Sequence, residues 1–498
     1  MLARGGNAVD AAIAAVAAQG VVAPETCGLG GDLFALVHAP GWDRPRALNS
    51  SGRAGSNTDA GALRDRGVTA IPGDHPAAVT IPGCVDGLVT LSSELGRLEL
   101  GSSLAPAIEL ATGGFPASTE QAGAFTRQAD IYRANPAVAA FYPDGSPVQR
   151  GERVVRADLA RTLEEVASGG REAFYGGTGG EDISAAVDGV ITLGDMAASQ
   201  AEWVDPISTD VSGLTAWAIP PNSQGYLGPG TLAVFQMLDP PDDPDDPLWW
   251  HLLIEAYRCL AWERDDLVSD PGTVALPADL ILDPERLERA AATVDPDRTG
   301  VWPQSMAAPH STAYLCTADS DGMAVSLIQS NYRGTGSPFG AARSGFLLQD
   351  RGMGFTLTPG HPNELAPGKR PLHTLAPTLW TEGDQPRWVI GTRGGAVQPQ
   401  LIAQLAGRAI LGGGDLDGAQ RAPRWTTAGF GPGTGSAVSL EPGVPEVVTA
   451  GLDKRGHSLD VLGRRQPGWG PMSIIELDGA ERRAAPDPRV DTTAALVF

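Results

Sequence analysis

Two runs of alternating apolar and polar residues, separated by a short turn, constrain the fold of this chain more than any other feature. The runs are TAYLCTAD, which begins at Thr312, and MAVSLIQS, which ends at Ser330. Alternation with a period of two residues is typical of strands. The intervening Ser320-Asp321-Gly322 contains an Asp-Gly pair, which is typical of tight hairpin turns. The pattern predicts an antiparallel hairpin with Thr312 at the first position of its first strand.

Helices are predicted on both sides of this hairpin in the sequence. Residues 7–19, NAVDAAIAAVAAQ, place apolar residues at helical spacing behind Asn7, and asparagine is favoured at a helix N-cap. Further helices are predicted within 85–95, 104–114, 151–203, 231–238, 251–266 and 400–411, and strands within 33–37, 214–219 and 387–392. No internal repeat is visible. This order of elements indicates stacked sheets covered by helices.

The charge of the chain excludes some classes of partner. Its 498 residues include 59 acidic and 36 basic residues, which gives a formal net charge of -23. Such a surface does not neutralise phosphates or attract anionic lipid. No apolar run approaches the roughly 18 residues that a membrane span needs, and no signal peptide is evident. We therefore expect neither nucleic acid nor membrane as a partner. The chain opens inside what looks like a domain, which leaves open a natural start further upstream.

The four cysteines give no indication of a metal site or of disulfide bonds. Cys27, Cys84, Cys259 and Cys316 lie far apart, and no C-x-x-C pair is present. Isolated thiols in a long chain are typical of a reducing compartment. The sequence therefore predicts free cysteines, a cytoplasmic location, and no metal or organic cofactor.

Two short stretches suggest ligand sites but have simpler interpretations. Residues 28–31, GLGG, lack the spacing of a dinucleotide-binding loop and precede a predicted strand where such a loop needs a helix, so a tight glycine turn is preferred. Residues 239–250, DPPDDPDDPLWW, lack the ligand order of a calcium loop. An exposed loop is the better interpretation, because proline prevents helix formation and the carboxylates repel one another.

Thr312 has a chemical possibility that an ordinary strand residue lacks. A threonine hydroxyl is a weak nucleophile without a base beside it, and His310 is the only histidine near it in the sequence. Cleavage of the Ser311–Thr312 peptide bond would free an α-amine with a pKa of about 7.7 to 8.0 next to the hydroxyl. That amine could act as the base. Threonine is also common in strands, so a purely structural residue is the alternative.

Six stretches together resemble the γ-glutamyltransferase family of N-terminal-nucleophile hydrolases. They are residues 5–38 (GGNAVDAAIAAVAAQGVVAPETCGLGGDLFALVH), 81–88 (IPGCVDGL), 219–226 (IPPNSQGY), 321–337 (DGMAVSLIQSNYRGTGS), 368–379 (GKRPLHTLAPTL) and 391–395 (GTRGG). The resemblance covers nearly the whole chain in the family's order. It implies an α+β fold, a four-layer αββα sandwich. It also implies a precursor that cuts itself into a large subunit, 1–311, and a small subunit, 312–498. The two remain associated as one composite domain, and a homodimer of this unit is left open.

The resemblance assigns catalytic roles to four residues and also places the cleavage site. Counting back from Asp321 places the processing threonine and nucleophile at Thr312, which makes Ser311 the other side of the cleavage site. Gly394 and Gly395 match the pair whose N–H groups form the oxyanion hole, with a glycine turn as the alternative. A second hydroxyl residue that assists the nucleophile falls at Ser330. Because strand residues alternate between faces, Ser330 is expected to share a polar pocket with Thr312, or else to be structural.

The acyl-group pocket departs from the family pattern. The family's arginine for the substrate α-carboxylate is replaced by Ser51, with Arg53 two residues further on. The aspartate for the substrate α-ammonium is replaced by Gly354, and a serine pair is replaced by His373 and Thr374. Arg53 is predicted to take over the role, or else to be a surface arginine. His373 and Thr374 are predicted to line the pocket, with a structural histidine as the alternative.

These departures imply an acylase-like branch of the family that cleaves small-molecule amides through an acyl-enzyme. An anionic acyl group is expected if Arg53 and His373 line the pocket. The first alternative is a true γ-glutamyl transferase or glutathione hydrolase. The second is a binding protein on the same fold that does not process itself.

Overall fold

The computed structural model describes residues 1–273, 276–302, 312–427, 437–490 and 492–497. Two antiparallel sheets lie at the centre of the molecule. In spatial order, the first contains β5 (Glu202–Val204), β2 (Arg46–Ser50), β1 (Asp32–His38), β9 (Ala324–Ser330) and β8 (Ala313–Ala318). The second contains β18 (Glu481–Ala484), β17 (Met472–Asp478), β13 (Gln385–Thr392), β12 (Thr378–Glu382), β7 (Leu214–Ala218) and β6 (Ile207–Val211).

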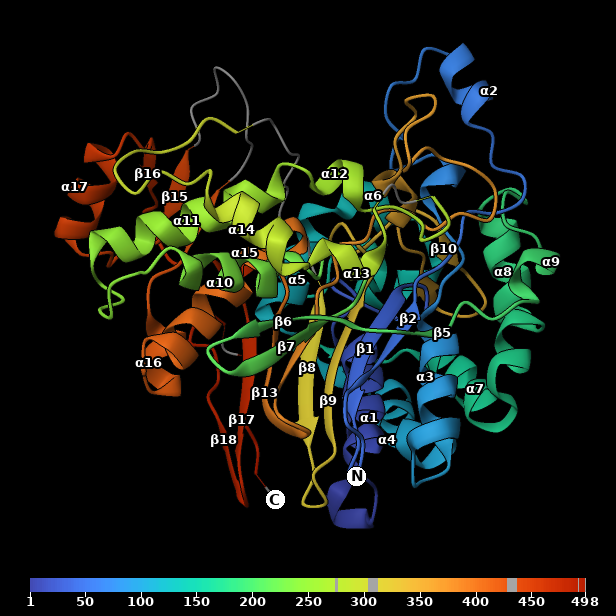
Figure 1. Ribbon diagram of the computed structural model, residues 1–498. Helices are drawn as coiled ribbons and strands as arrows, with labels where there is room; N and C mark the ends of the chain where they lie inside the picture. Colours follow the sequence, from blue (N-terminus) through green and yellow to red (C-terminus); the bar gives the residue numbers. More distant parts are fainter. Residues whose placement is uncertain (274–275, 303–311, 428–436, 491, 498) are drawn as a thin grey trace.

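Helices cover the outer face of each sheet, which completes a four-layer αββα sandwich (Figure 1). The first sheet is covered by α1 (Ala8–Val22) and α3 (Cys84–Leu95), and α4 (Leu100–Gly113) and α7 (Ala157–Tyr175) pack against these helices. The second is covered by α10 (Leu227–Met237) and α15 (Gln398–Ala406), and α11 (Pro247–Ala261) packs against both. The fold is therefore the one that the family resemblance predicted.

Shorter elements connect and flank these layers. The helices are α2 (Ala60–Asp65), α5 (Thr119–Arg127), α6 (Ala129–Tyr132), α8 (Thr178–Ala186), α9 (Leu193–Met196), α12 (Arg264–Leu267), α13 (Ala278–Ile281), α14 (Pro284–Ala291), α16 (Leu416–Arg421) and α17 (Glu446–Lys454). The strands are β3 (Phe115–Pro116), β4 (Arg153–Val154), β10 (Gly340–Ala341), β11 (Phe346–Leu347), β14 (Trp425–Thr427), β15 (Val438–Leu440) and β16 (Leu459–Val461).

The period-two pattern of the strands divides their side chains between two cores. In β1, Leu33 and Val37 pack against the helices of the first outer layer, whereas Phe34 and Leu36 pack between the sheets. Because successive strand residues point to opposite faces, one alternating strand supplies both cores. An apolar residue on either face of β1 therefore lies in a core, and the burial of the whole strand follows from this.

Local signals predicted several elements closely. Asn7 caps α1, and its side chain accepts hydrogen bonds from the Val9 and Asp10 N–H groups as a capping box. The hairpin of β8 and β9 turns at Gly322, which has a φ of 97°. Helix α10 differs from the expectation, since it begins at Leu227 and not near residue 231. Its first turn tolerates Pro229 because the N–H groups of a first turn have no intrahelical acceptor.

Candidate functional site

The predicted nucleophile lies at the start of the central hairpin. Thr312 directly precedes β8, and Ser330 ends β9, in a register that pairs Ala313 with Gln329. This register places Thr312 opposite Ser330, and the Thr312 Oγ1 donates a hydrogen bond of 3.2 Å to the Ser330 Oγ. Both side chains are buried. The structure thus brings together the two hydroxyl groups that the sequence singled out.

The backbone beyond Ser330 is held in an unusual conformation. Tyr332 has a φ of 78°, in the left-handed region that residues with a side chain rarely adopt. Its N–H donates a hydrogen bond of 2.8 Å to the Ser330 Oγ. The guanidinium carbon of Arg351 lies 3.9 Å from the centre of its ring. These contacts hold a conformation that costs on the order of 1–3 kcal/mol, and such strain is found mostly at functional sites.

The predicted oxyanion-hole glycines lie at the end of β13. Gly394 has a φ of 133° and Gly395 a φ of 58°, so a side chain at either position would strain the backbone. Gly395 opens a 3-10 turn, Gly395–Val397, that leads directly into α15. N–H groups at the start of a helical segment lack intrahelical acceptors and are suited to bind negative charge. This geometry is compatible with the predicted role.

Gln224 supports the glycine pair, and the sequence did not single it out. Its Nε2 donates hydrogen bonds of 3.0 Å to the carbonyl oxygens of both Gly395 and Thr374. Its Oε1 accepts a hydrogen bond of 3.2 Å from Arg264. Gln224 is fully buried and belongs to the family-like stretch 219–226. The motif was therefore the signal, but the partners of Gln224 lie far away in sequence.

A cavity of about 590 Å³ at the edge between the two sheets reaches Thr312. Its polar lining includes Thr312, Glu25, Glu120 and Arg393, the residue directly before the glycine pair. Arg393 forms an ion pair of 2.9 Å with Glu120. The Glu25 carboxyl has one buried oxygen without a hydrogen-bond partner among the described residues, and its burial raises its pKa to about 7. The volume is within the range of small-molecule sites.

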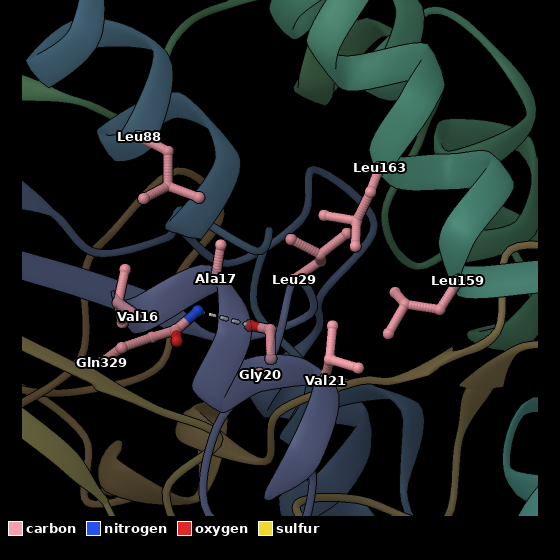
Figure 2. Close-up of a pocket in the computed structure, with 10 residues that line it drawn as sticks. Val16, Ala17, Gly20, Val21, Leu29, Leu88, Leu159, Leu163 and Gln329 are labelled. Atoms are coloured by element: carbon pink, nitrogen blue, oxygen red, sulfur yellow. Dashed lines mark hydrogen bonds between the residues drawn. The ribbon is translucent and has the colours of Figure 1, made fainter. Parts of the chain in front are cut away.

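A second hollow beneath α1 is a packing gap. It lies among apolar side chains of α1, α3 and α7, and Gln329 reaches its edge (Figure 2). The Gln329 Nε2 donates a hydrogen bond of 2.8 Å to the Gly28 carbonyl. Its free volume is about 10 Å³. That is close to the smallest space that can hold one water molecule. This hollow therefore offers no room for a substrate.

The structure places Arg53 in an ion-pair cluster. Its Nη2 lies 2.6 Å from Glu202, and Arg370 lies 2.8 Å from the other oxygen of the same carboxylate. The side chain of Arg53 is 28% exposed. Glu202 is therefore shared between two guanidinium groups, and Arg53 is held in this cluster.

His373 is buried and uncharged. Its Nε2 lies 3.0 Å from the Asp32 Oδ2, and its Nδ1 accepts a hydrogen bond of 3.3 Å from the Leu375 N–H, so the ring proton is on Nε2. Burial, together with the charge of Arg351, lowers the pKa of His373 to about 3. His373 therefore contributes no positive charge to the pocket at neutral pH, which favours the structural alternative.

The two replaced positions of the acyl-group pocket lack charge. Ser51 is buried, and its hydroxyl donates a hydrogen bond of 2.8 Å to the Asn49 side chain. Gly354 ends a 3-10 turn, Arg351–Gly354, and its carbonyl accepts a hydrogen bond of 2.6 Å from Asn363. Thr374, by contrast, faces a charge, since its Oγ1 accepts a hydrogen bond of 3.1 Å from Arg351.

A cluster of possible metal ligands lies away from this site. Ligand atoms of His251, Glu255 and His457 lie within 4.8 Å of one another. Arg258 donates to the His457 Nδ1, the His457 Nε2 lies 2.7 Å from the His251 Nδ1, and the His251 Nε2 lies 2.8 Å from a backbone oxygen of Asp295. Each histidine thus has a partner at both nitrogens. Because Arg258 adds a positive charge, the arrangement favours a hydrogen-bonded network over a cation site.

Two expectations concern the limits of the described chain. Ser311, the predicted residue on the other side of the cleavage site, lies outside the described residues, as does His310. Among the helices that the structure describes, none combines the length and the apolar character that crossing a membrane requires.

Comparisons with known proteins agree with this fold. The gamma-glutamyltranspeptidase family model matches residues 1–497. The chain is 32% identical to the glutathione hydrolase-like YwrD proenzyme of Bacillus subtilis, over 99% of this chain and 95% of that protein. It is 34% identical to the oxamate amidohydrolase proenzyme of Klebsiella pneumoniae, again over 99% and 95%. The crystal structure of cephalosporin acylase from Bacillus halodurans superimposes with a TM-score of 0.90 at 32% identity, covering 100% of this chain and 93% of that one.

The αββα sandwich is that of the N-terminal-nucleophile hydrolases. The chain belongs to the gamma-glutamyltranspeptidase family, and it is an amide hydrolase or acyltransferase of that family.

Proposed function

We propose that this protein is a self-processing threonine amidohydrolase that cleaves small amides through an acyl-enzyme. The observation that carries the proposal is the position of Thr312. It begins the central hairpin, donates a hydrogen bond from its hydroxyl group to the Ser330 Oγ, and lines a cavity large enough for a substrate. The proenzyme names of the relatives support cleavage into two chains, 1–311 and 312–498.

The proposed reaction uses groups of the chain alone. Cleavage of the Ser311–Thr312 bond frees the Thr312 α-amine, which takes the proton from Thr312 Oγ1 as that oxygen attacks the amide carbonyl. The N–H groups of Gly394 and Gly395 stabilise the oxyanion. The α-amine then protonates the leaving amine, and an ester to Thr312 remains. Water adds to the ester and releases the carboxylic acid, or an acceptor amine takes the acyl group.

The acyl group is expected to differ from γ-glutamyl. Ser51 and Gly354 supply no charge where the family pattern has an arginine and an aspartate. The names of the relatives include an oxamate amidohydrolase and a cephalosporin acylase, which support an amide without the γ-glutamyl head group. A true γ-glutamyl transferase is the second candidate, supported by the name of the Bacillus subtilis relative.

The four cysteines are free, which supports the predicted cytoplasmic location.

Denaturing mass spectrometry tests the proposal. The wild type is expected to give two fragments divided between Ser311 and Thr312, and Thr312→Ala one intact chain. Thr317→Ala is the matched control. Thr317 lies on β8, the strand that Thr312 precedes, but its hydroxyl group donates a hydrogen bond to the Ala8 carbonyl. This control should be cleaved like the wild type.

A wild type that stays a single folded chain would contradict the proposal and favour the non-processing binding protein. Once cleavage is established, turnover of γ-glutamyl-p-nitroanilide against simpler acyl amides separates the two enzymatic candidates.

A further inference from the structure

The most unusual charge near the nucleophile is Arg351. Its side chain is completely buried. Its Nη1 donates a hydrogen bond of 3.1 Å to the Thr374 hydroxyl. Its Nε and Nη2, which are also buried, have no hydrogen-bond partner in the part of the chain that the structure describes. A buried guanidinium edge without a partner is costly, and such groups are rare unless they serve a ligand.

Nearby carboxylates do not use this edge. Asp32 accepts hydrogen bonds from the Gly52 and Gly83 N–H groups and from the side chains of Gln349 and His373. Asp350 accepts one from the Arg333 N–H, and burial raises the pKa of its carboxyl to about 6. Burial also lowers the pKa of Arg351, to about 10, so the guanidinium remains charged at neutral pH. Both carboxylates act on the charge of Arg351, but neither accepts a hydrogen bond from its Nε or Nη2.

Arg351 is connected to both parts of the proposed catalytic site. Through the Tyr332 ring, 3.9 Å away, it contacts the residue whose N–H binds the Ser330 hydroxyl, the partner of Thr312. Through Thr374 it contacts the residue whose carbonyl shares Gln224 with Gly395. The Arg351 guanidinium thus contacts Tyr332, which binds the Ser330 hydroxyl, and Thr374, which shares Gln224 with the proposed oxyanion-hole glycine Gly395.

The free edge has the shape of a carboxylate-binding fork. The Nε–H and Nη2–H groups of an arginine point side by side, and two parallel hydrogen bonds to a carboxylate are the strongest contacts that this residue makes. Arg53 cannot offer the same fork without leaving Glu202. The unpaired donors for an anion are therefore the Nε and Nη2 of Arg351.

We propose that the Nε and Nη2 of Arg351 bind a carboxylate on the acyl group of the substrate, so that the protein selects small amides of dicarboxylic or 2-oxo acids. This inference names the substrate class of the proposed amidohydrolase and rests on that function. Tyr332 and Thr374 hold the guanidinium in place.

The test is the equilibrium binding of malonate, measured by calorimetry at constant ionic strength, with malonamide as the neutral counterpart. The wild type is expected to bind malonate more tightly than malonamide. Arg351→Gln should weaken malonate binding by about tenfold to a hundredfold, since a charge-assisted forked pair is lost. Arg53→Gln is the matched control and should change malonate binding less than about twofold, because a screened, partly exposed ion pair contributes little.

Equal binding of the two probes by the wild type, or unchanged malonate binding in Arg351→Gln, would overturn the inference. Arg351→Lys covers the case in which Arg351→Gln does not fold, as judged by circular dichroism. Lysine keeps the charge but not the fork, so it should still lose most of the malonate affinity. If it binds malonate like the wild type, the forked contact is refuted.

The same experiment separates this inference from the proposed function. Malonate contains no amide, so its binding does not depend on turnover. An uncut, inactive protein that binds malonate through Arg351 would refute the amidohydrolase but support the anion site. A cleaved, active protein without affinity for malonate would refute the anion site alone.

Discussion

The Ser330 hydroxyl accepts a hydrogen bond from the Thr312 hydroxyl and a second from the Tyr332 N–H, at 3.2 and 2.8 Å. One oxygen thus contacts the proposed nucleophile, Thr312, and the strained residue Tyr332 that lies beyond the end of β9. Since Thr312 and Ser330 lie opposite each other across the hairpin, the register of two strands sets their distance.

The first prediction concerns Ser330. Ser330→Ala removes the acceptor of the Thr312 hydroxyl, so we expect chain cleavage and kcat to fall by about tenfold to a hundredfold. Ser330→Thr retains the hydroxyl and should restore most of both rates. Cleavage is followed by denaturing gel electrophoresis and kcat by amide turnover. Wild-type rates in Ser330→Ala would show that the hydroxyl is only structural.

The second prediction concerns Gly391 in β13. A Cβ added at Gly391 would lie 2.2 Å from the ring of Tyr314, which is two residues from Thr312 on β8. Gly391→Ala must displace this ring, and we expect a loss of about 1–3 kcal/mol in the free energy of unfolding, together with slower cleavage. Urea unfolding measures the first effect. Gly113→Ala is the control, since no atom lies within 4 Å of its added Cβ. Equal stability of the two variants would contradict the prediction.

The third prediction concerns the buried Asp32–His373 pair. In Asp32→Asn, the new amide would place a donor against the His373 Nε2–H or against backbone N–H groups that now bind Asp32. One buried donor loses its acceptor, which costs about 1–3 kcal/mol of unfolding free energy. Asp205→Asn changes an 87% exposed carboxylate paired with Arg44 and should stay within about 0.5 kcal/mol. A similar effect of the two substitutions on urea unfolding would count against this account of the pair.

The fourth prediction concerns pH. Burial lowers the pKa of His457 to about 3, below the ordinary value of about 6.5 for an unfolded chain. Between these values the unfolded state binds the extra proton, so the stabilisation is present above about pH 6.5 and is lost as pH falls. Glu25 and Asp350, with pKa values raised to about 7 and about 6, act in the opposite direction. The prediction therefore concerns the difference in unfolding free energy between the wild type and a His457 variant, in which the effects of Glu25 and Asp350 cancel.

The difference in unfolding free energy between the wild type and His457→Asn should shrink by up to about 1.4 kcal/mol per pH unit as pH falls from 6 to 4. Urea unfolding at several pH values measures it. Burial is the main cause of the lowered pKa of His457, and Arg258, 3.2 Å from the His457 Nδ1, adds to it because it would repel a protonated ring. A difference that stays constant over this range would show that His457 does not titrate with folding.

Local sequence predicted the elements whose signals are contained within a few residues. The Asp-Gly turn and the alternation of β8 and β9 depend on neighbours along the chain, and so does the Asn7 cap of α1. The resemblance to the family supplied the four layers and brought Ser330 to Thr312. The predicted helix at 231–238 covered only part of α10, because Pro229 lies in the first turn and proline is usually a sign that a helix is absent.

The sequence by itself determined the hairpin and the family, and it predicted a nucleophile at Thr312, because these follow from short-range periodicity and from ordered motifs. Only the tertiary structure decided which of the buried and half-buried cations have a partner. Arg53 meets Glu202, 149 residues away, and His373 meets Asp32, 341 residues away, whereas the fork of Arg351 meets no described partner. Whether a buried charged group is paired depends on which residues lie beside it in space. Contacts between residues so far apart in the chain leave no local pattern in the sequence.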